Sequence, residues 1–461
     1  MPPRSDLYVR SPPDFVELSK DCAVLARGLT VFPDGTSTLD FQDEAVLRAL
    51  TERLLLKDFG VHVSEGLSPD RLCPAVPNRL AYVAWIEDLV HGTDLSLSRG
   101  RINVDEKSGQ TERKKRKLEA EKRRILDVGT GACCIYALLG CATNPDWTFV
   151  GTDIDAGSLQ RARRIVLDPL NAEVQLRERI TLVERRTDDP LLFFSPSSPA
   201  DAWPAYHATM CNPPFYASRD EMARSAAEKA TPPSAMCTGA DVEMTTAGGE
   251  VAFVSRIIDE SCLEPARSSV VWFTSMVGKH ASVAALVTKL ASAGVDNFLV
   301  NDLVSGSKTR RWILSWSHLP YHPRLTSSSA SRRASAAAAA SRSLIDCLCR
   351  TFKLAELHSA SSLAKTLAAL HGDVVEVTQD SVVPDSIRFR AWRDAWTRRA
   401  RRSKAAVICD TSKAPVLACT CTFRQASAEG EHHLDVEWTY GSSRDFFETF
   451  VSSVIVRWVN P

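Results

Sequence analysis

The fold class follows from the stretch Arg124-Ile125-Leu126-Asp127-Val128-Gly129-Thr130-Gly131-Ala132. An apolar run that enters a Gly-X-Gly turn is typical of the first strand of a doubly wound α/β domain. The two glycines let the backbone approach a ligand closely, and the helix expected from Cys133 to Leu139 offers its N-terminus to the same ligand. The stretch therefore predicts a mostly parallel sheet with a ligand at the end of its first strand.

A second strand, Trp147–Asp153, supports this interpretation. It ends in an acid about 20 residues after the turn, the spacing at which a carboxylate reaches ribose hydroxyls. A dinucleotide-binding turn is the alternative. That fingerprint needs a third glycine, however, and Cys134 stands in its place.

The second motif is Cys211-Asn212-Pro213-Pro214-Phe215, at the end of the expected fourth strand. The side-chain oxygen of Asn212 and the carbonyl of Pro213 can both accept hydrogen bonds from one planar NH2, which frees the nitrogen lone pair for attack. The prolines fix the backbone and remove competing donors, and Phe215 can stack on a base taken out of its strand. A Pro-Pro turn alone would look similar. Together with the glycine turn and Asp153, the motif predicts an S-adenosylmethionine-dependent methyltransferase acting on an exocyclic amine.

The amino-acid composition restricts which other classes of protein are possible. The chain has 461 residues, 24% of them charged and 44% hydrophobic, which suits a soluble protein of two or three domains. No apolar run reaches the length of a membrane span, and the charged, Pro-rich start does not resemble a signal peptide. The 13 cysteines form no regular framework, so we expect reduced thiols in a cytosolic or nuclear protein. With a net charge of zero, nucleic acid would have to bind at local patches.

The pattern along the chain predicts five segments. They are a helical N-terminal lead-in (1–90), a basic insertion loop (91–123), the methyltransferase domain (124–318), a linker (319–343) and a C-terminal α+β domain (344–461). Within the methyltransferase domain, a loop without clear period is expected from Tyr216 to Gly249, and the strands 298–304 and 311–317 are expected to form an antiparallel hairpin at the sheet edge.

The insertion contains Arg113-Lys114-Lys115-Arg116-Lys117, followed by Lys122-Arg123-Arg124. A solvated loop, a nuclear-import signal and a phosphate-binding arm all fit this run.

In the C-terminal segment we expect a helix at about 344–370, five strands and a final amphipathic helix after Ser442-Ser443. The strands are expected at 374–377, 387–390, 405–409, 415–423 and 433–440. An arginine cluster, Arg393–Lys404, interrupts the strands. It is either a polar hairpin loop or an RNA contact, and Trp392 and Trp396 between the charges favour RNA.

Two Cys-X-Cys pairs, Cys347/Cys349 and Cys419/Cys421, raise the question of zinc. Because alternating positions of a strand share one face, two small buried residues explain the second pair equally well. We predict no metal site.

Several further motifs lie between Pro12 and His318. They include Pro12–Phe15, Lys57–Gly60, Val76–Tyr82, Asp127–Ala132, Cys211–Phe215, Gly248–Glu250 and Arg310–Ser317. With them, this part of the chain resembles the methyltransferase-like protein 16 family of RNA adenosine-N6 methyltransferases, which is related to bacterial enzymes that modify an adenine of large-subunit ribosomal RNA.

The resemblance implies S-adenosyl-L-methionine as the cofactor, U6 small nuclear RNA as the most favoured partner, and a nuclear location, with the cytoplasm as a second one. It also implies that the lead-in (1–90) and the C-terminal auxiliary domain (344–461) bind RNA. It implies that Arg79 pairs with the methionine carboxylate, although that arginine could also be a surface charge at a helix start. The implied cofactor-binding residues are Arg79, Asp127, Gly129, Gly131, Asp153 and Asn212, and the implied catalytic residues are Asn212, Pro213, Pro214 and Phe215.

The chain departs from the family pattern in three places. The family more often has Glu at position 153, its insertion at 99–123 is shorter, and its loop after Phe215 carries dense arginines, of which Arg219, Arg224 and Lys229 remain here. RNA contacts must therefore be partly redistributed.

Two alternatives come from other classes. A protein glutamine methyltransferase would use the same acceptors for an amide NH2, but such sites favour Tyr at position 215. A catalytically silent RNA-binding scaffold would keep the motifs without cofactor affinity.

Overall fold

The computed structural model describes residues 7–63, 67–101, 122–194, 204–227, 241–305, 309–323, 349–354, 358–370, 374–379, 385–397, 400, 414–425, 432–441 and 443–460. The described residues belong to two compact units. The first draws on Met1–Glu87, Ala120–Ala293 and Val300–Ser315, and the second on Asp88–Glu119, Gly294–Leu299 and Trp316–Pro461.

The chain begins with short elements and then two long helices. They are α1 (Leu7–Arg10), α2 (Phe15–Ser19), α3 (Ala23–Gly28), β1 (Leu29–Val31), β2 (Ser37–Leu39), α4 (Glu44–Phe59) and α5 (Val76–Arg101). Helix α4 starts where the Asp43 carboxylate accepts hydrogen bonds from two backbone N–H groups, and it ends at Gly60 with a left-handed φ of 66°. The sequence predicted a helical lead-in over residues 1–90, but it predicted neither the antiparallel pair β1–β2 nor the continuation of α5 to Arg101, which makes the first part of the predicted insertion loop helical.

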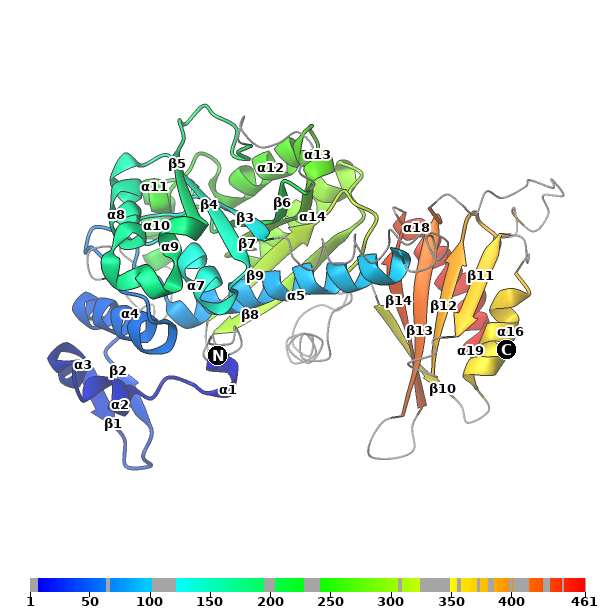
Figure 1. Cartoon of the computed structure of the whole chain (residues 1–461), viewed down its shortest axis with the longest axis horizontal. Coiled ribbons are helices and arrows are strands. Elements are labelled where there is room, and N and C mark those ends of the chain that lie inside the picture. The colour runs from blue at the N-terminus through cyan, green and yellow to red at the C-terminus, as the bar shows by residue number, and fades with distance from the viewer. Residues whose placement is uncertain are drawn as a thin grey trace. The chain divides into compact units, whose positions relative to one another are not determined.

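A seven-stranded sheet forms the core of the first unit (Figure 1). Its strands are β3 (Arg123–Val128), β4 (Trp147–Asp153), β5 (Ile180–Glu184), β6 (Tyr206–Cys211), β7 (Val270–Val277), β8 (Phe298–Ser305) and β9 (Thr309–Trp316). The order is β5-β4-β3-β6-β7-β9-β8, and β3 to β7 pair in parallel. Because the chain runs outward from β3 in one direction and returns to β6 on its other side, the strand order reverses between β3 and β6, where such sheets bind ligands.

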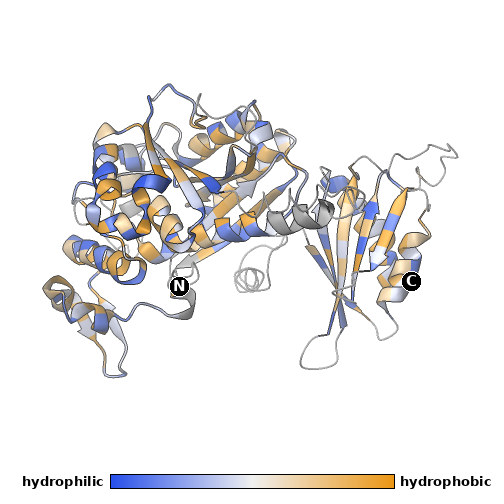
Figure 2. Cartoon of the chain, viewed as in Figure 1, coloured by the Kyte–Doolittle hydropathy of each residue, from blue (hydrophilic) through white to orange (hydrophobic). Residues whose placement is uncertain are grey.

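Helices cover the sheet. They are α7 (Ile135–Thr143), α8 (Ala156–Leu167), η1 (Pro169–Val174), α9 (Leu176–Arg179), α12 (Gly249–Ser261), α13 (Ala266–Ser269) and α14 (His280–Ser292). Right-handed crossovers place α7 and α8 on one face and α12 and α14 on the other. In Figure 2 the strands of this sheet carry mostly hydrophobic colours, consistent with burial on both faces.

The segment after Phe215 differs from the predicted loop. It contains α10 (Arg219–Ala227) and α11 (Asp241–Met244), while residues 228–240 lie outside the described residues. Helix α10 starts where the Ser218 hydroxyl accepts a hydrogen bond from the Glu221 N–H, a local capping contact without a clear periodic signal.

The second unit contains a five-stranded antiparallel sheet in the order β10-β14-β13-β12-β11. Its elements are β10 (Cys349–Leu354), α16 (Ala360–Ala368), β11 (Val375–Gln379), β12 (Ser386–Ala391), β13 (Leu417–Gln425), β14 (His432–Tyr440), α18 (Arg444–Phe450), η2 (Val451–Ile455) and α19 (Val456–Val459). The helix predicted at about 344–370 is wrong in its first half: strand β10 occupies part of it, because Cys349–Leu354 pairs with β14. The strand predicted at 405–409 lies outside the described residues.

The RNA contact predicted for Trp396 is wrong. Its side chain is only 1% exposed and packs edge-on against Phe450 at 5.4 Å between ring centroids, and its indole N–H donates to the Thr449 hydroxyl at 3.2 Å. The ring belongs to the core of this unit and has no face free for a base.

Cys419 and Cys421 are both buried in β13, on one face as the alternation predicted. Burial raises the pKa of the Cys421 thiol to about 12, so the thiol stays neutral at physiological pH. Within the described ranges, no group of three or more His, Cys, Asp or Glu side chains is placed to hold a metal ion. Cys347 lies outside the described residues.

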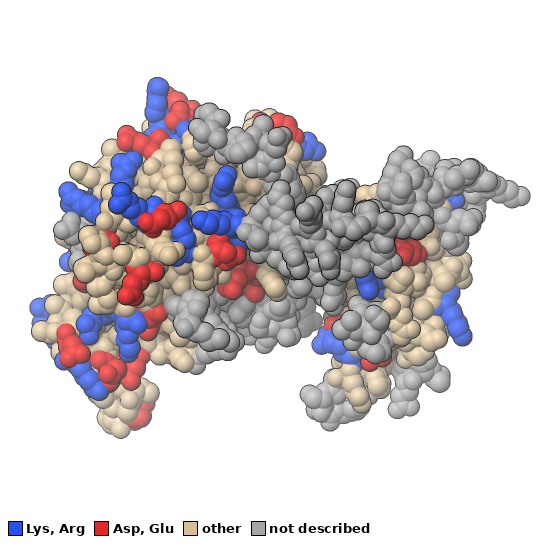
Figure 3. Space-filling model, in the orientation of Figure 1, with Lys and Arg blue, Asp and Glu red and all other residues tan. Residues whose placement is uncertain are grey.

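Charges of both signs are interspersed over the first unit on the face drawn in Figure 3, in keeping with the zero net charge. Among the helices that the structure describes, none combines the length and the apolar character needed to span a bilayer.

Candidate active site

The two sequence motifs meet at the carboxyl edge of adjacent strands. Val128 of β3 pairs with Cys211 of β6, so Gly129 and Asn212 follow at the same edge. Gly129 and Gly131 have φ values of 73° and 68°, which disfavour any residue with a Cβ. A side chain at Gly129 would meet nothing within 4 Å, so the turn presents its backbone to open space.

The acid that ends β4 is held beside the glycine turn. One carboxylate oxygen of Asp153 accepts the Gly131 N–H at 2.8 Å, and the other accepts the Asp155 N–H at 2.9 Å. Burial raises the pKa of Asp153. The next side chain, Ile154, is apolar and 47% exposed.

Asp127 lies fully buried beneath the turn. Its Oδ2 accepts the Thr130 hydroxyl at 2.7 Å, whereas its Oδ1 has no hydrogen-bond partner among the described residues. Burial, reinforced by the nearby Asp153 charge, raises the pKa of Asp127 to about 7. A buried carboxylate with an unsatisfied oxygen is costly, and a ligand that donates to this oxygen would remove part of that cost.

Arg79 brings a positive charge from helix α5 to the same site. Its Nη1 donates to the Tyr136 hydroxyl at 2.8 Å and lies 3.5 Å from the Met276 sulfur, and the guanidinium lies 5.6 Å from the centroid of the Tyr136 ring. One turn further along α5, the Tyr82 hydroxyl accepts the N–H of Cys211 at 3.3 Å. Helix α5 is therefore fastened to the strand that ends in the Asn-Pro-Pro-Phe motif.

The motif itself carries an unpaired acceptor. Asn212 Oδ1 is buried and has no hydrogen-bond partner among the described residues. Native structures rarely leave such an atom unsatisfied unless a ligand or water serves it.

The Phe215 ring sits between two contacts. The Arg311 guanidinium lies over the ring, 5.4 Å from its centroid. On another side Gly278 comes so close that a Cβ there would be 2.9 Å from the ring Cδ1. The carboxylate of buried Glu250 accepts the N–H groups of Gly278 at 2.7 Å and Lys279 at 3.1 Å, which fixes this loop against the ring.

The residue after the ring is also fixed. The Tyr216 N–H donates to the Met244 carbonyl at 3.1 Å, and the Tyr216 carbonyl accepts the Thr246 N–H at 2.9 Å. The segment that ends in α11 thus runs beside the end of the motif.

All nine predicted site residues lie at this carboxyl edge or on the elements fastened to it. An open glycine turn, a buried acid beside it at the end of β4, a fixed cation and an unpaired amide oxygen followed by an aromatic ring define a class. The class is that of S-adenosylmethionine-dependent methyltransferases that act on a planar amine.

Comparisons with known proteins specify the family. A family model described as RNA methyltransferase matches residues 2–320. The chain is 31% identical over 423 residues to a U6 small nuclear RNA (adenine-(43)-N(6))-methyltransferase of Schizosaccharomyces pombe, covering 90% of this chain and 94% of that protein. The chain belongs to this family of RNA methyltransferases, as the sequence predicted.

Other relatives agree. Human RNA N(6)-adenosine-methyltransferase METTL16 is 32% identical over 67% of this chain and 49% of its own length, so the chain spans about half of that relative. Ribosomal RNA large subunit methyltransferase F of Psychromonas ingrahamii is 33% identical over 67% of this chain and 92% of that protein. Among solved structures, the human Mettl16 catalytic domain in complex with MAT2A 3'UTR hairpin 6 has a TM-score of 0.53 at 30% identity, covering 69% of this chain and 96% of that chain.

The sequence did not single out two residues of the site. Arg311 and Glu250 stood within quoted motifs but had no assigned role, because their contacts with Phe215 and with the Gly278 loop join distant segments.

Proposed function

We propose that this protein methylates N6 of an adenosine in RNA, with U6 small nuclear RNA as its target. The Schizosaccharomyces pombe relative, matched over 94% of its length, bears the name of that activity. The observation that carries the chemistry is the buried, unpaired Asn212 Oδ1 at the edge shared with the glycine turn. An exocyclic NH2 would supply the missing donor.

In this proposal the cofactor lies along the glycine turn. The backbone of Gly129 and Gly131 and the guanidinium of Arg79 would hold its amino-acid end, and Asp153 would hold the ribose hydroxyls. The unpaired Asp127 Oδ1 would accept from the cofactor's ammonium group. When bound, S-adenosylmethionine supplies an electrophilic methyl group on a positively charged sulfur.

The residues after β6 would hold the target base. Asn212 Oδ1 and the Pro213 carbonyl would accept hydrogen bonds from the two N6–H groups and hold the nitrogen lone pair toward the methyl donor. The methylated nitrogen would then lose one proton to water. The Pro214 ring would keep this carbonyl in place, and the base would stack on the Phe215 face that Arg311 leaves uncovered. Catalysis would come mainly from positioning, which can contribute several kcal/mol, and no metal is needed.

One assay separates this function from its rivals. Purified protein is incubated with labelled cofactor and either total RNA or total protein, and the digests are analysed for the methylated species. We expect N6-methyladenosine in the RNA arm. Methylglutamine in the protein arm would establish a glutamine methyltransferase, and no product despite RNA binding would establish a silent scaffold.

Asn212→Ala tests the assigned role. Turnover should fall by orders of magnitude, because the amine would lose its orienting acceptor, while cofactor affinity should stay nearly unchanged. If cofactor affinity collapsed instead, Asn212 would belong to the cofactor site alone.

We also propose that the C-terminal unit assists RNA binding and that the protein acts in the nucleus. Arg388 and Arg390 alternate with the buried Ile387 and Phe389 along β12, so their side chains stand on the sheet face opposite the aromatic core. Removing residues 349–461 should weaken RNA binding more than cofactor binding. Replacing the basic run 113–117, which lies outside the described residues, should move a fluorescent fusion out of the nucleus if that run is an import signal.

A further inference from the structure

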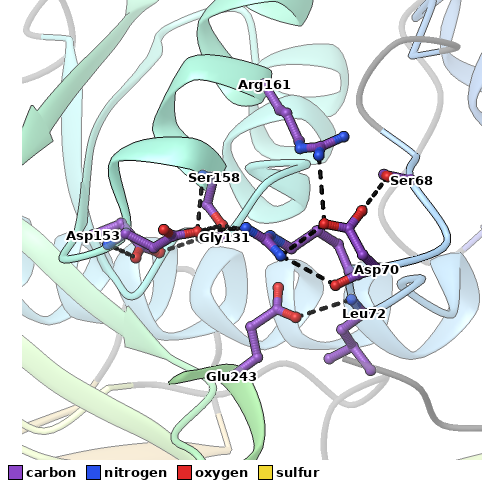
Figure 4. Close-up of polar contacts among 10 residues, drawn as sticks. Ser68, Asp70, Leu72, Gly131, Asp153, Ser158, Arg161 and Glu243 are labelled. Carbon is purple, nitrogen blue, oxygen red and sulfur yellow. Dashed lines mark hydrogen bonds and ion pairs between the residues drawn. The ribbon is translucent and has the colours of Figure 1, made fainter. Parts of the chain in front are cut away.

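The short segment Ser68–Leu72 is held by two arginines, Arg71 within the segment and Arg161 of α8, whose Nη2 lies 3.4 Å from Asp70 Oδ2 (Figure 4). The Arg71 Nη2 donates to Asp155 Oδ2 at 2.9 Å, and its Nε donates to the Ser158 hydroxyl at 3.2 Å. Only 16% of this side chain is exposed. The segment is held next to the cofactor side of the site, not loose in solvent.

The contact between Arg71 and Asp155 is connected to the glycine turn through further hydrogen bonds. Asp155, which receives Arg71, donates its own N–H to Asp153 Oδ1, and Asp153 Oδ2 receives the Gly131 N–H. Three hydrogen bonds therefore join Arg71 to the turn at which the cofactor is proposed to bind.

A residue far away in the sequence also contacts the segment Ser68–Leu72. Glu243, in α11, accepts the Leu72 N–H on Oε2 at 3.0 Å. Its Oε1 lies 3.9 Å from the point where a side chain on Gly131 would begin. Figure 4 shows Glu243 beside both residues, so a molecule lying on the glycine turn meets this carboxylate.

Glu243 is also close in sequence to the residues that fix Phe215. The next residue, Met244, accepts the Tyr216 N–H, and Tyr216 directly follows the ring. One carboxylate therefore connects the cofactor side (Leu72 and Gly131) with the side proposed for the target base.

We propose that Glu243 is a positioning residue that couples the binding of the two substrates. The inference rests on the site roles proposed above. A cofactor on the glycine turn would contact Glu243 Oε1 and favour the state in which Glu243 holds Leu72. That state fixes α11, and with it Tyr216 and the ring beside which the adenosine stacks. Cofactor and RNA then strengthen each other's binding by the same factor, as linkage requires.

The experiment measures this factor directly. The substrate RNA is first established as the strand that the wild-type protein methylates, so a failure of the proposed function is seen before coupling is measured. The affinity for S-adenosylhomocysteine is then determined by calorimetry with and without that RNA, and the RNA affinity with and without S-adenosylhomocysteine. For the wild-type protein we expect about tenfold coupling, within the usual range for linked sites.

Two variants test the residue. Glu243→Ala removes the acceptor for Leu72, and the coupling should fall below about twofold. Glu243→Gln keeps one acceptor oxygen for the Leu72 N–H and presents an NH2 group in place of Oε1. Because a cofactor hydroxyl can accept a hydrogen bond from that NH2, the variant should retain most of the coupling. The proposal is overturned if the wild-type protein shows no coupling, or if the alanine variant keeps it.

Glu260 provides a matched control. Its Oε2 likewise accepts a backbone N–H from a distant segment, that of Leu192 at 2.9 Å, while its Oε1 pairs with Arg256 at 3.0 Å. Glu260→Ala should lower the melting temperature about as much as Glu243→Ala and leave the coupling intact. Equal loss of coupling in both variants would mean that general destabilisation, not Glu243, is responsible.

Discussion

Gly278→Ala should displace Phe215, the ring on which the target base is proposed to stack, and should leave cofactor binding unchanged. The new Cβ would lie 2.9 Å from Phe215 Cδ1 and 3.2 Å from Cε1, and 3.1 Å from a Glu250 carboxylate oxygen. Carbon atoms in contact prefer about 3.5 to 4.0 Å. The ring must therefore move by roughly 0.6 to 1 Å, because the hydrogen bonds from Glu250 hold the Gly278 loop in place.

This displacement sets the size of the effect. A shift of about 1 Å in a residue that positions a substrate can cost on the order of a hundredfold in rate. We expect kcat/KM for RNA methylation to fall by about 30- to 100-fold. The affinity for S-adenosylhomocysteine should change less than about twofold, since Gly278 contacts neither Gly129 nor Asp153.

The assay is steady-state methylation of the RNA substrate, paired with calorimetry for S-adenosylhomocysteine and a thermal melt. Gly28→Ala is the matched control, because its Cβ would lie 2.7 Å from a methyl group of the buried Val46, a similar clash away from the site. It should lower the melting temperature and spare kcat/KM. A Gly278→Ala enzyme with wild-type kcat/KM, or one that loses cofactor affinity in parallel, would refute the assigned position of Phe215.

Three further predictions test other parts of the molecule. Burial raises the pKa of Asp127 to about 7, so the carboxyl group must lose its proton before it can pair with the cofactor's ammonium group. The affinity for the cofactor should therefore rise about 15-fold between pH 5.5 and 7. Calorimetry should show no such pH dependence for Asp127→Asn, and an equally steep pH profile in that variant would exclude this role. Arg79→Met keeps the volume but removes a charge-assisted contact, so the dissociation constant of the cofactor should rise about 30-fold in calorimetry, and a change below threefold would contradict the proposed pairing. Trp396→Ala leaves a cavity in the core of the second unit and should destabilise it by about 4 kcal/mol in a denaturant melt, with cofactor affinity unchanged; a stable variant with weakened RNA binding would restore the RNA-contact interpretation.

The sheet could be predicted because its signals are local. The apolar run of β3 ends at a turn that only glycine suits, with φ values of 73° and 68° at Gly129 and Gly131, and the acid of β4 follows at a fixed spacing. Parallel strands then bring Gly129 and Asn212 to one edge without further information. For this reason the predicted ranges of β4, β8 and β9 agree with the structure within about two residues, whereas no range was predicted for β5.

The errors share a different cause. Strand β10 was missed because its short segment gains its ordered form from pairing with β14, more than 70 residues later. Trp396 was misjudged because arginines surround it in sequence, whereas Phe450 and Thr449 surround it in space. Composition near a residue does not reveal which distant segment buries it.

For the same reason, the sequence reveals the residues that would contact the substrates but not the residues that position them. Residues that would touch the substrates stand in short motifs, because the carboxyl ends of neighbouring strands must present them together. Residues such as Glu243 and Arg71 act through hydrogen bonds to segments elsewhere in the chain, and those bonds leave no pattern in either segment. If Glu243 couples the two substrates, the order in which the enzyme binds them is set by contacts that its motifs do not encode. Variants outside the motifs would then change cooperativity while leaving the chemical step intact.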